Sequence, residues 1–259
     1  MKDQSLEEYF YREKLDQYIN EPQSDTRDVF DAVTGGINEP IPPNLEDIVR
    51  LHQMIRKNMS FTVLEFGVGF STLIIADALK KNKNDWGALQ SKPRVRNRYM
   101  FKCFSVDSSK KWINKTSARL PNELSSIVEF SFSEVSIGTY QGQLCSYYDK
   151  LPDIVPDFIY LDGPDPKAVK GSIGGLSFQC DERTVNSGDI LLMEPTLLPG
   201  TTILVDGRTN NARFLANNFK RNFSMEWDRT GDITIFKLNE ERLGKYNVLG
   251  SDFIRNPTV

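Results

Sequence analysis

The sequence has few cysteines, no long apolar run and no excess of positive charge. Its three cysteines, Cys103, Cys145 and Cys180, are odd in number and scattered, and no two of them form a metal-ligand pair. This usage predicts reduced thiols rather than a disulfide framework. No apolar run approaches the roughly 18 residues of a membrane span, and the charged N-terminus is unlike a signal peptide. We therefore expect a soluble, cytoplasmic protein without a membrane partner.

The charge balance also argues against a nucleic-acid partner. The formal net charge is -3, whereas proteins that grip nucleic acid usually present a basic face. One basic cluster does occur at nearly alternate positions, in Lys92, Arg94, Arg96, Arg98 and Lys102. We interpret it as the solvated face of an insertion. The alternative is a site for nucleic acid or a phosphorylated substrate.

A chain of 259 residues is long enough for one sizeable α/β domain. We predict an N-terminal helical extension over residues 1–60, a main domain over 61–240 and a tail over 241–259. Within the extension, apolar residues of 45–58 recur at helical spacing, and Asn44 is placed to cap that helix.

From residue 61 onward, strand-like and helix-like segments alternate. The sequence predicts strands at 61–66, 100–107, 125–132, 157–163 and 201–207, helices at 71–82, 108–120 and 210–222, and a closing pair of strands at 223–228 and 232–238. This order predicts a Rossmann-like three-layer α/β sandwich, whose mostly parallel seven-stranded sheet has an antiparallel edge strand pair. Two stretches interrupt the alternation, a polar insertion at 83–99 and a glycine-rich loop at 164–188.

Acidic residues stand at or near the ends of four predicted strands. The first strand runs into VLEFGVGFST (63–72), which holds Glu65, and the others end in Asp107, Asp162 and Asp206. The carboxyl ends of parallel strands meet at one edge of a sheet, where ligands of open α/β folds bind. We therefore predict a binding site at this edge. The alternative for each acid is a helix cap, and it is strongest for Asp107, which precedes two serines.

The glycine turn indicates which ligand binds there. Gly67 and Gly69 let the backbone approach a ligand closely, and the helix that follows points its N–H groups at the same place. A dinucleotide fingerprint requires a third glycine where Thr72 stands, and the Glu65 carboxylate would repel a pyrophosphate. S-adenosylmethionine carries an ammonium, a sulfonium and a ribose, so the acids Glu65 and Asp107 suit it better than NAD.

The chain resembles the class I S-adenosylmethionine-dependent methyltransferases, and in particular their small-molecule O-methyltransferase subgroup. The resemblance is carried by VLEFGVGFST, FSVDSS, DFIYLDGP and MEWDRTGDITIFKL, and it spans residues 45–238. It implies S-adenosylmethionine as the cofactor. It also implies a cofactor-binding set of Glu65, Gly67 and Gly69 at the methionine part, Ser71 and Thr72 close to it, Asp107 and Ser108 at the ribose, and Asp162 near the sulfonium.

The chain departs from this family at the proposed base. Many members of the subgroup place a histidine directly after the fourth-strand aspartate, but Gly163 follows Asp162 here. The one histidine, His52, lies among apolar residues and is interpreted as a packed structural residue. Any base must then be a carboxylate, a lysine or a tyrosine. The candidate catalytic residues are Asp162, Asp206 and Arg208, with Asn210, Asn211 and Arg213 nearby.

Metal-dependent methyltransferases that resemble this family use a later Asp-Asn pair together with the fourth-strand aspartate. Asp162 and Asp206 would offer hard oxygen ligands, but Gly207 stands where that asparagine would follow. We therefore predict no metal, with a magnesium-like site as the alternative. Arg208 is interpreted as recognising a carboxylate or phosphate of the substrate, and the alternative is an ion pair with a neighbouring acid.

The predicted function is methyl transfer from S-adenosylmethionine to a small polar molecule at a hydroxyl oxygen, with an anionic substrate as one option. The alternatives are a nicotinamide-dependent oxidoreductase and a non-catalytic binding protein of the same fold. We expect the segments 164–188 and 83–99 to determine the methyl acceptor. The sequence leaves the acceptor and the oligomeric state open, and a homodimer is one of the states it allows.

Overall fold

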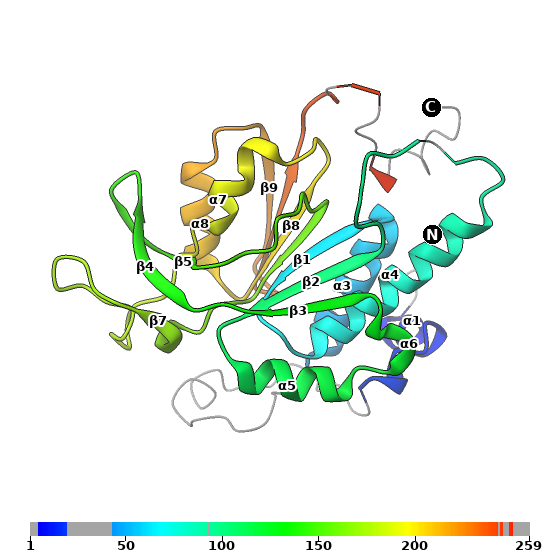
Figure 1. Cartoon of the computed structure of the whole chain (residues 1–259), viewed down its shortest axis with the longest axis horizontal. Helices are drawn as coiled ribbons and strands as arrows, with labels where there is room; N and C mark the ends of the chain where they lie inside the picture. The colour runs from blue at the N-terminus through cyan, green and yellow to red at the C-terminus, as the bar shows by residue number, and fades with distance from the viewer. Residues whose placement is uncertain (1–4, 20–42, 93, 243, 246–248, 251–259) are drawn as a thin grey trace.

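A twisted seven-stranded sheet forms the centre of the computed structural model, which describes residues 5–19, 43–92, 94–242, 244–245 and 249–250 (Figure 1). The strands lie in the order β3-β2-β1-β6-β8-β10-β9. Their bounds are β1 Thr62–Phe66, β2 Lys102–Asp107, β3 Val128–Phe132, β6 Phe158–Leu161, β8 Thr202–Asp206, β9 Phe223–Asp228 and β10 Ile233–Leu238. The pairs from β3 through to β8 are parallel, and β10 runs antiparallel to both β8 and β9. The predicted fold class, with its antiparallel edge pair, is confirmed.

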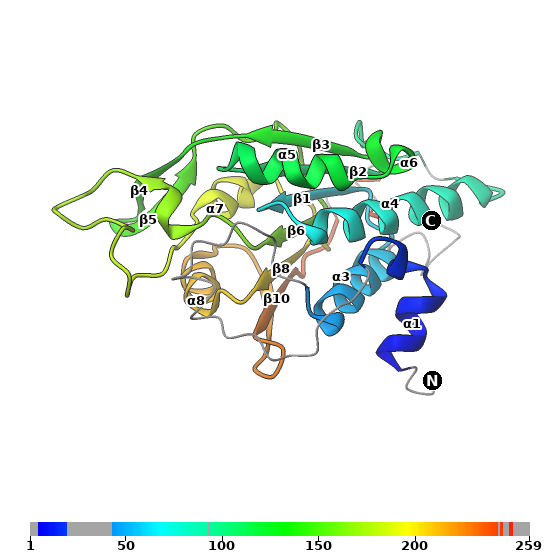
Figure 2. The same cartoon turned by 90° about the horizontal axis from the view of Figure 1, so that it is seen from below.

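Helices cover both faces of this sheet because successive strand residues point to opposite faces. Val63 of β1 packs in one core cluster with α3 (Leu45–Asn58) and α4 (Phe70–Ala88). Its neighbour Leu64 packs in the other cluster with α7 (Asp189–Met193) and α8 (Thr209–Asn218). Two short helices, α5 (Lys110–Arg119) and α6 (Asn122–Ser125), follow β2, and η3 (Glu194–Thr196) follows α7 (Figure 2).

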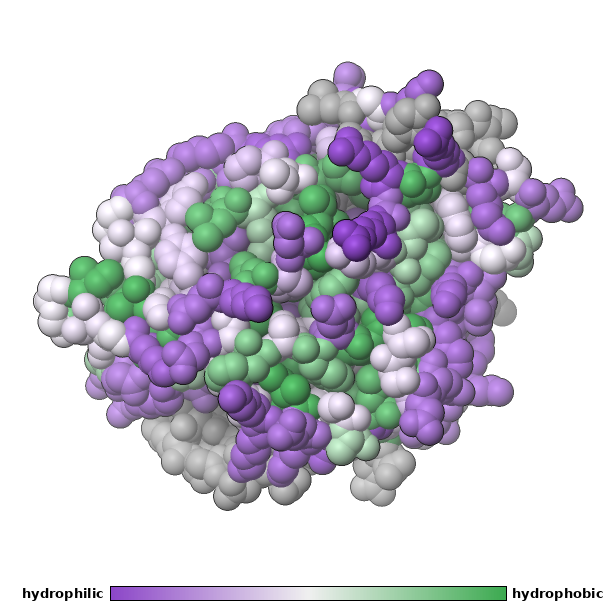
Figure 3. All heavy atoms as spheres, viewed as in Figure 1, coloured by the Kyte–Doolittle hydropathy of each residue, from purple (hydrophilic) through white to green (hydrophobic). Residues whose placement is uncertain are grey.

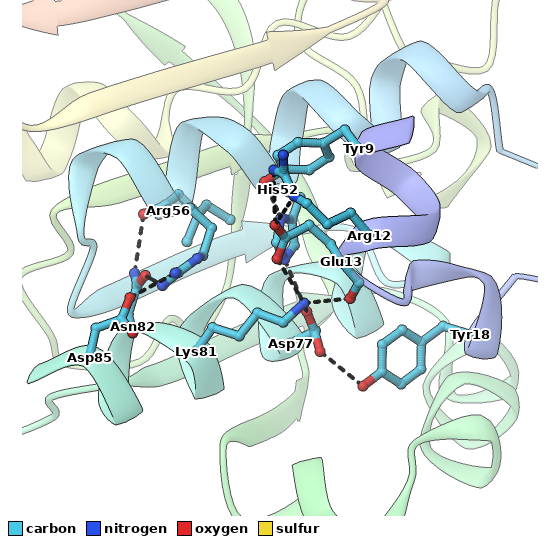
Figure 4. A network of polar contacts seen from close by, with 11 residues as sticks. Tyr9, Arg12, Glu13, Tyr18, His52, Arg56, Asp77, Lys81, Asn82 and Asp85 are labelled. Carbon is cyan, nitrogen blue, oxygen red and sulfur yellow. Dashed lines mark hydrogen bonds and ion pairs between the residues drawn. The ribbon is translucent and has the colours of Figure 1, made fainter. Parts of the chain in front are cut away.

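The N-terminal elements α1 (Leu6–Arg12) and η1 (Leu15–Gln17) pack beside α3 and α4. Asn44 caps α3 by accepting from the Glu46 N–H at 2.8 Å, as predicted. His52 is fully buried between two partners, the Tyr9 hydroxyl at 2.7 Å from Nδ1 and Asp77 Oδ2 at 2.9 Å from Nε2 (Figure 4). Since Asp77 lies on α4, the histidine links three helices, in agreement with a structural role.

The structure places the segment 83–99 differently from our prediction, both in how much of it is irregular and in where it lies. Helix α4 continues to Ala88, so the first part of the insertion is helical. The segment after it leads into the amino end of β2, where the Thr62 hydroxyl donates to the Tyr99 carbonyl at 3.0 Å. The expectation that 83–99 shapes the acceptor site is therefore wrong, because this segment lies at the edge of the sheet opposite the acids. Its arginines Arg94, Arg96 and Arg98 are exposed. The face of the molecule in Figure 3 carries hydrophilic and hydrophobic residues interspersed.

A second, three-stranded sheet was not predicted. In the connection between β3 and β6, the strands β4 (Val135–Tyr140) and β5 (Gln143–Tyr148) form a hairpin, and β7 (Val169–Lys170) pairs with β4 in parallel. The hairpin turns at Gln141-Gly142, whose φ angles are 50° and 78°, as a tight two-residue turn requires. This sheet projects at the left of Figure 1, close to α7.

Candidate active site at the carboxyl edge of the sheet

Strand register brings the predicted acids to one edge. Phe66 of β1 pairs with Val106 of β2 and with Leu161 of β6, and Leu161 pairs with Val205 of β8. The residue that follows each of these four positions therefore lies at the same level. These residues are Gly67, Asp107, Asp162 and Asp206.

The glycine turn after β1 and the turn after β6 meet at backbone contact. Gly67 has φ +95°, which favours glycine, and a Cβ there would lie 3.4 Å from the Asp162 carbonyl. A Cβ on Gly163 would lie 2.8 Å from the Gly67 nitrogen. The Asp162 N–H also donates to the Phe66 carbonyl at 3.0 Å. Because these two residues have no side chains, the carboxyl ends of β1 and β6 approach each other to backbone contact.

Glu65 lies beneath this junction and is fully buried. Its carboxylate accepts hydrogen bonds from the hydroxyls of Ser71, Thr72 and Ser105, at 2.6, 2.7 and 2.5 Å. Burial raises the pKa of Glu65 to about 7, although the three hydroxyls oppose the shift. Glu65 therefore orders the first turn of α4 and joins it to β2, and the hydroxyls of Ser71 and Thr72 are turned toward it.

Asp107 connects the glycine turn to the end of β2. Its Oδ2 accepts from the Val68 N–H at 3.0 Å, and its Oδ1 accepts from the Ser109 N–H at 2.6 Å. Ser109 in turn caps α5 by accepting from the Trp112 N–H at 3.3 Å. Burial raises the pKa of Asp107, and these backbone hydrogen bonds oppose the shift. The Ser108 backbone also donates to it, so the carboxylate orders two loops at once, and one of its roughly four lone pairs is left for a ligand hydroxyl.

A cavity of about 500 Å³ reaches Ser108, the residue that follows Asp107, and its volume is within the usual range of small-molecule sites. It is lined by Ser108, Phe132, Glu134, Lys167, Ala168, Val169, Lys170, Gly171 and Gln179. Most of these residues belong to the loop 164–188, which contains η2 (Pro166–Ala168) and β7. Its two lysines are ion-paired, Lys170 with Glu134 at 2.6 Å and Lys167 with Asp181. The glycine-rich loop therefore forms one wall of the site.

Arg208 holds the turn after β6. Its guanidinium donates to the carbonyls of Asp162 at 2.6 Å and Pro164 at 3.1 Å, and its Nε lies 3.8 Å from Asp162 Oδ1. The alternative of an ion pair with a neighbouring acid thus matches the structure. The Asp162 side chain is 56% exposed. By contrast, Asp206 accepts a hydrogen bond from the buried Tyr160 hydroxyl.

The asparagines that follow Arg208 hold the other end of the glycine-rich loop. Asn211 Oδ1 accepts from the Ser187 N–H at 2.9 Å, and Asn210 Nδ2 donates to the Thr184 hydroxyl at 3.0 Å. The Arg213 guanidinium lies 5.9 Å from the centre of the Trp227 ring, on β9. Asn210 and Asn211 therefore fix the loop to α8.

One residue of the site was missed in the sequence. Tyr148 of β5 places its hydroxyl 2.8 Å from the position that a Cβ on Gly163 would take. Nothing in its sequence context, CSYYD, distinguishes it from a core tyrosine, and its position depends on the hairpin that was not predicted.

Within the described ranges, no group of three or more His, Cys, Asp or Glu side chains is placed to hold a metal ion, so the absence of a metal stays a prediction. Among the same residues, no helix is both long and apolar enough to cross a membrane.

No family model matches the chain, and no curated protein matches it. Solved structures that are similar include an O-methyltransferase from Bacillus cereus in complex with SAH (14% identity, TM-score 0.45, covering 91% of this chain and 100% of that one). A SAH-bound methyltransferase from Podospora anserina has 13% identity and TM-score 0.47, with coverages of 90% and 97%. The O-methyltransferase TomG from Streptomyces achromogenes, in complex with SAM, has 12% identity and TM-score 0.45, with coverages of 92% and 100%. At this level of similarity, the evidence for the fold is the strand order of the sheet itself.

Proposed function

We propose that this protein transfers a methyl group from S-adenosylmethionine to a hydroxyl oxygen of a small polar molecule. One observation carries the proposal. Asp107 holds the glycine turn through Val68, at the junction where Gly67 and Gly163 pass each other without side chains. A carboxylate beside a bare glycine turn suits a ligand that combines hydroxyl groups with positive charge.

The residues at this edge fit the cofactor. Asp107 would accept a ribose hydroxyl, and Ser108 lines a cavity that is also lined by Phe132. Gly67 and Gly69, with Ser71 and Thr72 behind them, would hold the amino-acid part, and Asp162 would lie near the sulfonium. Glu65 supports this set indirectly through its three hydroxyl partners. When bound, S-adenosylmethionine supplies a methyl group activated by the positively charged sulfur.

The charge of the site favours this cofactor over a nicotinamide dinucleotide. Asp107 and Asp162 both lie at the edge where the ligand would bind, and Asp162 is largely exposed. Carboxylates attract a sulfonium or an ammonium and repel a pyrophosphate. For the same reason, the site disfavours the oxidoreductase alternative.

In this proposal Asp162 accepts the proton of the methyl acceptor. Asp162 is more exposed than Asp206, whose carboxylate already accepts a hydrogen bond from the Tyr160 hydroxyl. A positioned base of this kind contributes roughly 10²–10⁴-fold in rate, and the remaining acceleration comes from alignment of acceptor and methyl carbon. Arg208 acts on Asp162 through the backbone carbonyls that it holds, so its role is to position the base.

The acceptor would lie against the loop 164–188, which forms one wall of the cavity and is fixed to α8 by Asn210 and Asn211. An anionic group on the acceptor remains a prediction, because the Arg208 guanidinium is held by the carbonyls of Asp162 and Pro164. The cytoplasmic location and the lack of a nucleic-acid partner remain predictions.

Titration calorimetry with S-adenosylhomocysteine and with NAD tests the cofactor. We expect binding of the first only, and at least a ten-fold loss of affinity in Asp107→Ala. Asp153→Ala, which removes an exposed acid, serves as the matched control. If the wild-type protein does not bind S-adenosylhomocysteine, the proposal is wrong. Release of S-adenosylhomocysteine from labelled cofactor in the presence of a metabolite pool then separates an enzyme from a pure binding protein.

A further inference from the structure

Strand β9 forms one edge of the main sheet, and β3 forms the opposite edge (Figure 1). Two large apolar side chains of β9 are exposed, Met225 at 46% and Trp227 at 38%. The strand pairs with β10 in continuous register, without a bulge, and it contains no proline. Bulges and prolines are two of the features that protect an edge strand from pairing with a further strand. β9 is therefore open to such pairing.

The register of β9 and β10 shows which backbone groups face this open edge. The Asn239 N–H donates to the Asn222 carbonyl, on the β9 side, at 2.8 Å, and the next N–H along the chain, that of Leu238, donates to the Thr201 carbonyl on the β8 side. Hydrogen-bonded and non-hydrogen-bonded pairs alternate along an antiparallel ladder. The even-numbered residues of β9 therefore bond to β10, and the odd-numbered residues direct their N–H and C=O groups outward.

The same odd-numbered residues place their side chains on one face of the sheet. Phe223 pairs with Leu238 and Met225 pairs with Phe236, and both partners belong to the core cluster on the side of α7 and α8. Trp227 follows on that face because side chains alternate along a strand. The outward backbone groups thus coincide with an apolar margin of the core.

A second copy of the same chain fits this edge when it is related by a two-fold axis. An axis at Glu226 would place two carboxylates directly opposite each other, which is destabilising, and an axis at Ser224 would shorten the paired segment. An axis at Met225 places Met225 opposite the partner's Met225, and Trp227 opposite the partner's Phe223. Glu226 then lies opposite the partner's Ser224, on the other face.

We propose that two copies of this chain associate through β9, in an antiparallel pair centred on Met225 that joins their main sheets. The Met225 N–H donates to the carbonyl of the partner's Met225, and the Trp227 N–H donates to the carbonyl of the partner's Phe223. This contact closes on itself, whereas pairing of β9 with β3 of another copy would extend into a filament. The pairing goes beyond the proposed methyl transfer and does not depend on it.

Sedimentation velocity of the full chain from about 1 to 100 μM tests the association, since a contact of one strand pair is expected to be weak. We expect a reversible dimer. Met225→Pro removes an outward N–H, which an edge strand tolerates. The variant should therefore melt close to the wild type while its dimer affinity falls by at least about ten-fold.

Met225→Lys is a second disrupting variant, because it places two ammonium groups across the axis, where like charges repel. Leu192→Lys adds the same charge at an exposed apolar position of α7. As the matched control, it should form dimers like the wild type. A wild-type protein that is monomeric over the whole range, or assembles beyond a dimer, would overturn the proposal. A dimer that survives both Met225 variants would overturn it as well.

Met225→Cys tests the register. Its two Cα atoms would lie about 5.5 Å apart in a hydrogen-bonded pair, within the span of a disulfide, so mild oxidation should give a covalent dimer. Glu226→Cys is the control, because its Cα atoms would lie diagonally, about 7–8 Å apart, and should cross-link much less. Both variants also carry Cys180→Ser, since Cys180 is exposed. Cross-linking of Glu226→Cys in preference to Met225→Cys would contradict a pair centred on Met225.

Discussion

The Asp107 carboxylate accepts the Val68 N–H at 3.0 Å, and so a residue at the end of β2 holds the glycine turn at the end of β1. The same side chain accepts the Ser109 N–H through its other oxygen. The sequence allowed Asp107 to be interpreted either as a helix cap or as a ligand contact. Its position at the carboxyl edge, with these two backbone contacts, is compatible with both roles. Its removal should affect stability and binding together.

Asp107→Asn separates these effects in part. An amide has one accepting oxygen, so one of the two backbone N–H groups would lose its partner and face a donor instead. We expect the free energy of unfolding to fall by roughly 1–3 kcal/mol, measured by urea denaturation without ligand. Asp153→Asn, on the surface, should leave it unchanged. An unaltered stability of Asp107→Asn would contradict the importance of these two contacts.

Gly163→Ala tests the close approach of the two turns. The new Cβ would lie 2.8 Å from both the Gly67 nitrogen and Tyr148 Oη, so the backbone must move. We expect a loss of about 1–3 kcal/mol in the free energy of unfolding, visible as a lower melting temperature, together with weaker binding of S-adenosylhomocysteine.

Gly87→Ala provides the control for that substitution. Gly87 lies in α4 with no atom within 4 Å of the added Cβ, so alanine should raise stability by roughly 0.5–1 kcal/mol.

Adding Tyr148→Phe to Gly163→Ala should restore part of the lost stability, because it removes one of the two clashing atoms. If the double variant is no more stable than Gly163→Ala, the clash with the hydroxyl is not a source of the loss.

The main sheet could be predicted because its strands are short apolar runs between helical segments, and the runs of β1, β2, β6 and β8 each end at an acid or a glycine. The hairpin β4–β5 was not predicted, since only the Gln141-Gly142 turn and a weak alternation of apolar and polar residues indicate it. The length of α4 was underestimated because its last turns carry polar residues on an exposed face, which in sequence resemble a loop. Local polarity shows solvent exposure, and it does not distinguish a surface helix from an insertion.

The candidate site was predictable only at the level of strand ends. That Asp107 and Asp162 lie at one edge follows from parallel pairing, which the alternation of elements implies. The orientation of Glu65 does not follow, because it depends on Ser105 from a different strand. Similarly, Tyr148 reaches Gly163 only through the unpredicted hairpin. Contacts between distant segments decide which of these side chains can face a ligand.

Glu65 should make stability depend on pH. Its pKa in the folded protein is raised to about 7, above the value of about 4.3 expected for an unfolded chain. The folded state then binds the proton more tightly, so the contribution of this group is fully present below pH 4 and is lost as pH rises to about 7. In Glu65→Gln, the fall in unfolding free energy between pH 4 and pH 8 should be smaller than in the wild type. Glu226→Gln, at an exposed position of β9, should keep the wild-type slope, and an unchanged slope in Glu65→Gln would contradict the assignment.

The network around His52 should contribute to stability without contributing to methyl transfer. Tyr9→Phe removes the hydroxyl 2.7 Å from His52 Nδ1 and leaves a buried nitrogen unpaired (Figure 4). We expect the free energy of unfolding to fall by roughly 1–3 kcal/mol, with the affinity for S-adenosylhomocysteine unchanged at a temperature where the variant is folded. Tyr11→Phe, at an exposed position of the same helix, should alter neither quantity. The network lies among α1, α3 and α4, whereas the candidate ligand contacts lie at the carboxyl edge of the sheet. A loss of cofactor affinity in Tyr9→Phe would therefore show that docking of the N-terminal helix and the binding site are coupled through α4.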